Sequence, residues 1–204
     1  MANDHLGFGR RQAFLYPDYA LSREATMDYV IVDLEATCWQ GSRVHNMEII
    51  EIGAVYLDGD VLRPMDDFQQ FVKPTTNPVL TDFCRDLTAI QQRQIDSAPA
   101  FPAAFDNFLQ WIGDHPFRLG SWGAFDFKLF DHELTRHNQE WPRCFSGHVN
   151  LKKLYSRAYS TNGDVGLPEA MRKLQLSFEG RRHRGLDDAI NIARVAQTIL
   201  ALDR

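Results

Sequence analysis

The sequence predicts an α/β fold in which a mixed five-stranded sheet is flanked by helices. Three segments with strand-like composition follow one another between residues 29 and 74, which is typical of a meander. Helical periods then alternate with short strand-like segments up to the end of the chain. No linker or internal repeat divides these segments, and 204 residues with 44% hydrophobic side chains suit one domain with a sizeable core.

The first three strands are expected to form an antiparallel meander. Residues 29–36 (YVIVDLEA) and 48–58 (EIIEIGAVYLD) are rich in β-branched side chains, which favour strands. Residues 58–60 (DGD) have the chemistry of a turn, and residues 67–74 (DFQQFVKP) are interpreted as a third strand that a proline closes.

The rest of the chain supplies helices and two further strands. Residues 117–122 (FRLGSW) and 148–151 (HVNL) are expected to be strands. Pro168 is placed at a helix start, and residues 186–202 form a strongly periodic final helix. Two more apolar helix faces are predicted from the spacing of their large side chains (Phe127, Phe130 and Leu134; Phe101, Phe105, Phe108, Leu109 and Ile112).

The composition and the N-terminus narrow the class of protein. Residues 1–27 show no clear period and are expected to be an extension, which leaves residues 28–204 as the compact domain. They lack the apolar block of a signal peptide, and no apolar segment is long enough to span a membrane. Three scattered cysteines without a C-x-x-C pair argue for a reducing compartment. We therefore expect a cytoplasmic protein without a membrane partner, and no pattern sets its oligomeric state.

The first predicted strand ends in two carboxylates. Asp33 and Glu35 lie on the same face because side chains alternate along a strand. Like charges so placed repel each other unless a positive charge lies between them, and a metal ion is one such charge. Two other acid pairs are interpreted as solvated surface, one in the predicted turn and one on the exposed side of a helix (Asp58 with Asp60; Asp131 with Glu133).

Two further places carry candidate site residues. Asp126 lies at a strand-to-helix junction, where it could face the end of the first strand or simply interact with the helix dipole. His183 precedes Asp188 by five residues, a spacing that no other histidine of the chain has. The alternative for this segment is a surface histidine followed by two helix-capping acids, with Asp187 best placed as the cap.

Taken together, these residues predict a hydrolytic metal site. Four carboxylates at the ends of elements and one histidine are the minimum set for two-metal hydrolysis of a phosphodiester. Hard divalent cations such as Mg²⁺ or Mn²⁺ prefer oxygen ligands, and two of them can activate a water and stabilise the leaving oxygen. A histidine can accept the proton because its pKa lies near working pH. The net charge of −5 gives no basic footprint of nucleic-acid binding, but acids gathered around metals lower the net charge without repelling a phosphate.

The motifs resemble those of the DEDDh family of 3′→5′ exonucleases, in its Eri-type branch. VDLEATCW is similar to the first family motif, SWGAFD to the second and HRGLDDAINIA to the third, and the likeness covers roughly residues 28–202. The resemblance implies a ribonuclease H-like fold and two Mg²⁺ or Mn²⁺ ions. In this assignment the four metal ligands are Asp33, Glu35, Asp126 and Asp188, and His183 is the general base. The H-x-x-x-x-D spacing of the family selects Asp188 over Asp187.

One departure from the branch concerns the backbone. LTAI, residues 87–90, stands where the branch commonly has Leu-Thr-Gly-Ile. The alanine should be tolerated unless that residue takes a positive φ or approaches the substrate closely.

The resemblance also implies substrate contacts. Ala36, Thr37 and Cys38 would offer backbone amides and small side chains to a terminal nucleotide, and Trp39, Trp122 and Phe125 are candidates for base stacking. The expected substrate is the 3′ end of single-stranded nucleic acid, RNA first, with release of nucleoside 5′-monophosphates. A proofreading or repair exonuclease on DNA is the alternative, because the motifs do not distinguish the sugars. A nucleic-acid-binding module without catalysis is the third reading.

Overall fold

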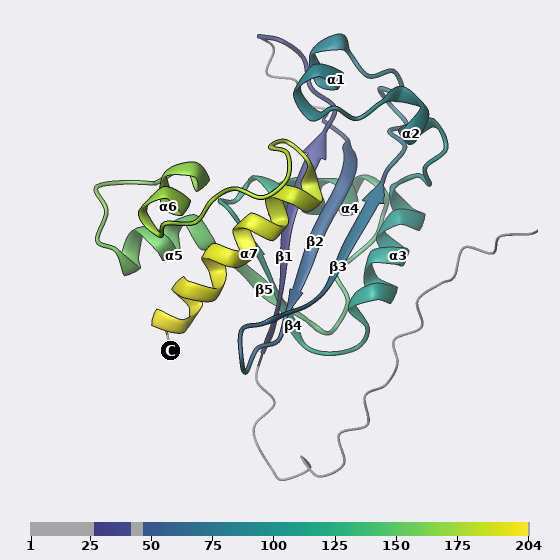
Figure 1. The fold of residues 1–204 in the computed structure, drawn as a ribbon. Coiled ribbons are helices and arrows are strands. Elements are labelled where there is room, and N and C mark those ends of the chain that lie inside the picture. The colour runs from purple at the N-terminus through teal and green to yellow at the C-terminus, as the bar shows by residue number, and fades with distance from the viewer. Residues whose placement is uncertain (1–26, 42–46, 204) are drawn as a thin grey trace, which may run out of the picture.

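The structure is a computed structural model that describes residues 27–41 and 47–203. The expected N-terminal extension therefore lies outside the described residues, except for Met27. Five strands form one sheet in the order β3-β2-β1-β4-β5, as Figure 1 shows. Their bounds are β1 (Asp28–Ala36), β2 (Ile49–Leu57), β3 (Pro64–Phe71), β4 (Phe117–Ser121) and β5 (Phe145–Asn150).

The sheet is mixed, which confirms the predicted fold class. β1 pairs antiparallel with β2, and β2 pairs antiparallel with β3, so the meander is confirmed. β4 runs parallel to β1 on its other side, and β5 runs parallel to β4. The third strand begins at Pro64 and ends at Phe71, earlier than expected. It is an edge strand with exposed charged side chains, so its apolar pattern did not mark its start.

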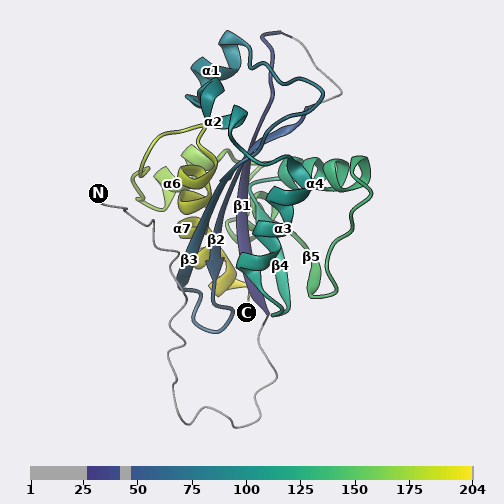
Figure 2. The ribbon, with the colours of Figure 1, turned by 90° about the vertical axis from the view of Figure 1, so that its right-hand side faces the viewer.

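Helices cover both faces of the sheet, as the two views in Figures 1 and 2 show. α3 (Phe101–Ile112) and α4 (Phe125–Arg136) pack on one face, against the side chains of Val30 and Val32. α5 (Leu151–Ala158), α6 (Leu167–Lys173) and α7 (Gly185–Leu202) pack on the other face, against Ile31. The alternation of side chains along β1 thus divides the core into two layers. Among the described helices, none is long and apolar enough to cross a membrane.

Two short helices stand at the end of the sheet to which β1 points (Figure 1). They are α1 (Asp82–Thr88) and α2 (Gln92–Asp96), and sequence reasoning assigned neither. They enclose a small core of their own, which is formed by Ile50, Leu80, Cys84, Ile90 and Ile95. Their few turns give too short a period to be recognised in the sequence.

Ala89 follows α1 in the left-handed region, with φ of 59°. Its amide donates to the carbonyl of Arg85 at 2.8 Å and so closes the helix. This is the alanine of LTAI, and the positive φ that would make it unfavourable is present.

One interpretation of a surface acid pair is wrong. Asp131 is exposed, but Glu133 is 1% exposed and lies 3.1 Å from Arg136. Glu133 belongs to the buried side of α4, where the guanidinium compensates its charge.

Candidate active site

Three carboxylates converge where the end of β1 meets the start of α7. Asp33 and Glu35 project from one face of β1, and Asp188 comes from the first turn of α7. One carboxylate oxygen from each of the three lies within 4.8 Å of the others. The structure therefore brings together acids that are more than 150 residues apart in the chain.

Two glycines allow α7 to approach the sheet closely enough for this convergence. A Cβ atom added to Gly53, which pairs with Asp33 across the strands, would lie 1.9 Å from the carbonyl carbon of Gly185. A Cβ on Gly185 would in turn lie 3.0 Å from the carbonyl oxygen of Asp33. The backbone of α7 thus rests directly on β1 and β2, and a side chain at either position would push Asp188 away.

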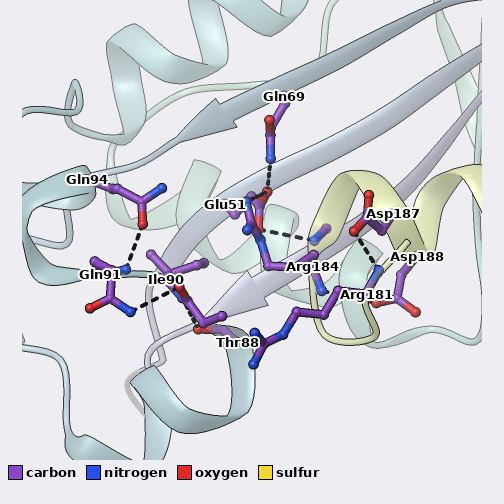
Figure 3. Close-up of polar contacts among 12 residues, drawn as sticks. Glu51, Gln69, Thr88, Ile90, Gln91, Gln94, Arg181, Arg184, Asp187 and Asp188 are labelled. Atoms are coloured by element: carbon purple, nitrogen blue, oxygen red, sulfur yellow. Dashed lines mark hydrogen bonds and ion pairs between the residues drawn. The ribbon is translucent and has the colours of Figure 1, made fainter. Parts of the chain in front are cut away.

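A fourth acid, Glu51, lies beside the three and was missed by sequence reasoning. It pairs with Glu35 across β1 and β2 and is fully buried. Its carboxylate accepts hydrogen bonds from Arg184, from the amide of Gly185 at 3.1 Å and from the side chain of Gln69 (Figure 3). Glu51 therefore fixes the start of α7 to β2. An acid inside the otherwise apolar strand β2 was the available signal.

The two adjacent acids of α7 have different partners. Asp188 accepts a hydrogen bond from the amide of Arg184 at 3.2 Å, and Asp187 accepts one from the amide of Arg181 at 2.8 Å. The two side chains point to different parts of the loop before α7 (Figure 3). The expectation that Asp187 caps the helix is wrong, because the N-cap residue is Arg184 and Asp187 holds the preceding loop instead. That loop folds back over Gly180, where an added Cβ would lie 2.5 Å from the Asp187 carboxyl carbon.

Asp126 reaches the site from the opposite face of the sheet. It lies in the first turn of α4 and is 6% exposed. Its Oδ1 accepts a hydrogen bond from the amide of Leu34, at 3.1 Å, and Leu34 separates Asp33 from Glu35. The carboxylate is thus tied to the strand that carries the other two acids. Burial raises the pKa of Asp126 to about 6, although the Leu34 amide acts in the other direction.

His183 lies in the loop just before α7 and is exposed. Its φ is 61°, in the left-handed region that residues other than glycine seldom adopt, although asparagine, aspartate and histidine do so more often than the rest. The amide of the next residue, Arg184, donates to the Asp188 carboxylate at 3.2 Å, so the loop is anchored while the exposed imidazole can face solvent or a substrate.

The electrostatics of the cluster favour a cation. Burial, with the charges of Glu51 and Asp188, raises the pKa of Glu35 to about 8. Burial, with the charges of Asp126 and Asp188, likewise raises the pKa of Asp33 well above its usual value. These acids resist ionisation side by side, and a bound cation would relieve both the burial penalty and the repulsion.

The donor set fits a hard divalent metal. The convergent groups are all carboxylates, with no sulfur among them, which suits Mg²⁺ or Mn²⁺ rather than zinc in a thiolate site. Asp33, Glu35 and Asp188 could hold such an ion directly, and Asp126 approaches from the far side of β1.

The segment after Glu35 is rigidly held. Ala36 and Thr37 are buried, and Cys38 and Trp39 are half-buried. The Thr37 amide donates to the carbonyl of Glu48 at 2.9 Å, and its hydroxyl accepts from the Glu48 amide at 3.0 Å. The amide of Thr37 is therefore already used within the fold, and the contact of these residues with a nucleotide stays a prediction.

The two aromatic residues near Asp126 differ in environment. Trp122 is half-buried, donates from its indole to the carbonyl of Val165 at 3.2 Å and forms a T-shaped ring contact with Tyr155. Phe125 is 54% exposed directly beside Asp126. A side chain that already fills the core has little surface left for a base, so Phe125 offers the better stacking platform.

A sequence model of the exonuclease family RNase_T matches residues 30–196 of this chain. The 3′-5′ exoribonuclease 1 of Homo sapiens is 36% identical over 187 residues, which cover 85% of this chain and 52% of that protein. The protein of the same name from Rattus norvegicus is 35% identical over 185 residues, covering 85% of this chain and 53% of its own length. The chain thus spans about half the length of these relatives.

Solved structures share the fold. One is described as the nuclease domain of 3′hExo, a DEDDh family member, bound to rAMP. It has a TM-score of 0.80 and 32% identity, and the match covers 88% of this chain and 94% of that one. Another, described as 3′-end specific recognition of histone mRNA stem-loop by 3′-exonuclease, has a TM-score of 0.78 and 31% identity, with 86% of this chain and 64% of that one covered.

Proposed function

Since this chain belongs to the RNase_T exonuclease family, we propose that it is a metal-dependent 3′→5′ exonuclease. It would remove nucleoside 5′-monophosphates from the 3′ ends of single-stranded RNA. The observation that carries the proposal is the convergence of Asp33, Glu35 and Asp188, with Asp126 tied to the strand between the first two. The preference for RNA is supported by the relatives, which are named exoribonucleases.

The residues have distinct tasks in this reaction. Asp33, Glu35, Asp126 and Asp188 would hold two ions of the Mg²⁺ or Mn²⁺ type. When bound, these ions supply an acidified water and neutralise charge on the phosphodiester. His183 accepts a proton from the attacking water, for which its exposed ring on an anchored loop is suited. Phe125 supports the terminal base from the side of Asp126.

The direct test is hydrolysis of defined strands. Single-stranded and duplex RNA and DNA of one sequence, labelled at the 5′ end, would be incubated with Mg²⁺ or Mn²⁺ and the products separated by length and identified. We expect a ladder shortened from the 3′ end, nucleoside 5′-monophosphates as products and faster loss of single-stranded RNA. Faster loss of DNA would favour a proofreading or repair exonuclease that acts on DNA. Binding of the strands without turnover in either metal would favour a nucleic-acid-binding module without catalysis.

Two neighbouring acids provide a matched pair of variants. Asp188→Asn removes a charge from the convergent cluster. Asp187 lies outside that cluster, and Asp187→Asn keeps a side-chain oxygen that can accept the hydrogen bond from the Arg181 amide. We expect the first to abolish nucleotide release and weaken Mn²⁺ binding in calorimetry, and the second to retain both. Equal activity of the two variants would contradict the assignment of the metal ligands.

The base is tested by His183→Asn. Asparagine tolerates the positive φ of this position, so the loop should keep its conformation while the imidazole is removed. We expect turnover to fall by roughly 100-fold or more, with Mn²⁺ binding unchanged. Turnover close to that of the wild type would exclude His183 as the base.

A further inference from the structure

A lysine stands beside the turn that delivers Asp126 to the site. Lys152 lies in the first turn of α5, which follows β5, and β5 pairs with β4 up to the register of Ser121 with Asn150. The turn after β4 contains Gly123, with φ of 122°. The Lys152 ammonium nitrogen lies 3.8 Å from the place that a Cβ on Gly123 would occupy. The ammonium therefore faces the β4–α4 turn rather than open solvent.

The charge of this lysine is not used within the fold. Lys152 is half-buried, yet over residues 27–41 and 47–203 it has neither an ion pair nor a side-chain hydrogen bond. Burial raises the pKa of Asp126, and the positive charge of Lys152 acts against this rise, so the ammonium lies within electrostatic reach of the acid cluster. Arg184, on the other side of the cluster, is already paired with Glu51. A partly desolvated cation without a partner is suited to bind an anion that the protein does not itself supply.

We propose that Lys152 binds a backbone phosphate of the nucleic-acid strand on the Asp126 side of the active site. The inference rests on the proposed function, since it assumes that a strand enters there. The buried acids at this end of the sheet would repel a polyanion, and a cation beside them gives one phosphate a favourable place. A contact of this kind positions the strand without reading its bases.

The matched control is the next residue of the same helix. Lys153 is exposed, whereas Lys152 faces Gly123, and glutamine at either position removes the same unit charge. Both variants would be made in the His183→Asn protein, in which hydrolysis is slow and the acids are intact. Binding of a fluorescent single-stranded RNA in Mg²⁺ would be followed by anisotropy, from about 50 to about 200 mM salt, with thermal melting as a check of folding.

The salt dependence of RNA binding distinguishes the loss of a phosphate contact from a change in the shape of the protein. The slope of log K against log salt should become shallower by about 0.7 in Lys152→Gln, as expected when the protein no longer neutralises one phosphate of a single strand. The affinity should fall to a similar degree for RNAs of different sequence, and Lys152→Arg should restore the slope. Lys153→Gln should leave the slope unchanged.

The outcomes distinguish this inference from the proposed function. Suppose that the His183→Asn parent binds RNA, that the wild type cleaves it, and that Lys152→Gln and Lys153→Gln have equal salt slopes. This result overturns the role of Lys152 and leaves the proposed function standing. A parent that binds no strand, together with a wild type that releases no nucleotide, overturns both.

Discussion

Arg184 and Glu51 form a two-point ion pair directly beside the candidate metal site. The Nε and the Nη2 atoms of Arg184 each lie 3.3 Å from a different oxygen of Glu51, across 133 residues of sequence. Glu51 is fully buried and faces Glu35 on the neighbouring strand, so its charge adds to the repulsion within the cluster. Arg184 also follows His183 directly and lies over the ring of Phe71, 5.6 Å from its centre. One guanidinium thus compensates a buried acid and anchors the histidine loop.

Replacing Arg184 with glutamine should therefore reduce both stability and activity. The side chain of Arg184 is 22% exposed and that of Glu51 is 0% exposed. Within residues 27–41 and 47–203, the variant therefore leaves a buried carboxylate with only Gly185 and Gln69 as hydrogen-bond partners. We expect a loss of about 2 to 4 kcal/mol in the free energy of unfolding. Urea titration measures it, and Arg181→Gln is the control because that side chain is exposed.

A double-mutant cycle identifies the cause of this loss. If the unpaired charge of Glu51 is responsible, Glu51→Gln added to Arg184→Gln should recover part of the stability. Strict additivity of the two substitutions would show that the ion pair contributes nothing.

Gly53→Ala should disturb the site without touching any of its acids. The new methyl group would collide with the backbone of Gly185, so the start of α7 must move away from the sheet. Overpacking of this kind costs about 1 to 3 kcal/mol, and a displacement of about 1 Å in a catalytic group can cost about 100-fold in rate. Steady-state rates and urea titration measure the two effects. Gly166→Ala is the control, because an added Cβ there meets only the ring of Pro168 at 3.8 Å.

Much of the fold could be predicted from the sequence because long periodic segments state which side of an element is buried. The alternation along residues 29–36 and the helical period of residues 101–112 each correspond to an element of the structure. The short helices α1 and α2 could not be predicted in this way. The start of edge strand β3 could not be predicted either, because its first residues are exposed and include charged side chains. The first and last residues of a helix or strand depend on the geometry of the adjoining turns, which the pattern of apolar residues does not show.

Only those site residues whose roles follow from neighbouring residues in the sequence could be predicted. Asp33 and Glu35 share a strand, so period-2 alternation placed them together. The role of Glu51 depends on a partner 133 residues away, and no local pattern shows that pairing. The position of Asp187 suggested a helix cap, but the loop before α7 folds back and the amide of Arg181 donates a hydrogen bond to the Asp187 carboxylate. Long-range contacts of this kind appear only in the folded chain.

Ala89→Gly should stabilise the protein. Ala89 closes α1 with φ of 59°, where a side chain costs about 1 to 2 kcal/mol and glycine is relaxed, although glycine gains freedom in the unfolded chain. We expect a net gain of about 0.5 to 1 kcal/mol in the free energy of unfolding. Ala103→Gly, on the exposed side of α3, should instead lose about 1 kcal/mol. A loss at both positions would contradict the strain at Ala89.

The stability of the metal-free protein should fall as pH rises through neutrality. The pKa of Glu35 is raised from 4.5 to about 8, so the folded protein keeps a proton that the unfolded chain has released. Because the folded state binds more protons in this interval, its stability is fully present below pH 4.5 and is lost as pH rises toward 8. The lowered pKa values of His137 and His148 act in the opposite direction, but only up to their ordinary value of 6.5. The hydrogen bond with the Cys38 side chain lowers the pKa of Cys84 to about 7, so Cys84 also acts in the opposite direction above pH 7. The difference between the wild type and Glu35→Gln from pH 6.5 to 8 therefore reports Glu35.

Thermal melting in EDTA across this interval measures the effect, and Mg²⁺ or Mn²⁺ should reverse it. Metal binding requires the acids to be ionised and releases their protons, so the stabilisation by metal should grow with pH. Glu35→Gln removes one of the titrating groups and should flatten the decline in EDTA. Glu133, whose pKa burial raises to about 7, lies outside the cluster and titrates in the same direction whether or not metal is present. An identical pH dependence of the melting temperature for the wild type and Glu35→Gln in EDTA would show that the buried acids do not carry the cation site. A metal effect that is the same at pH 6.5 and pH 8 would show the same.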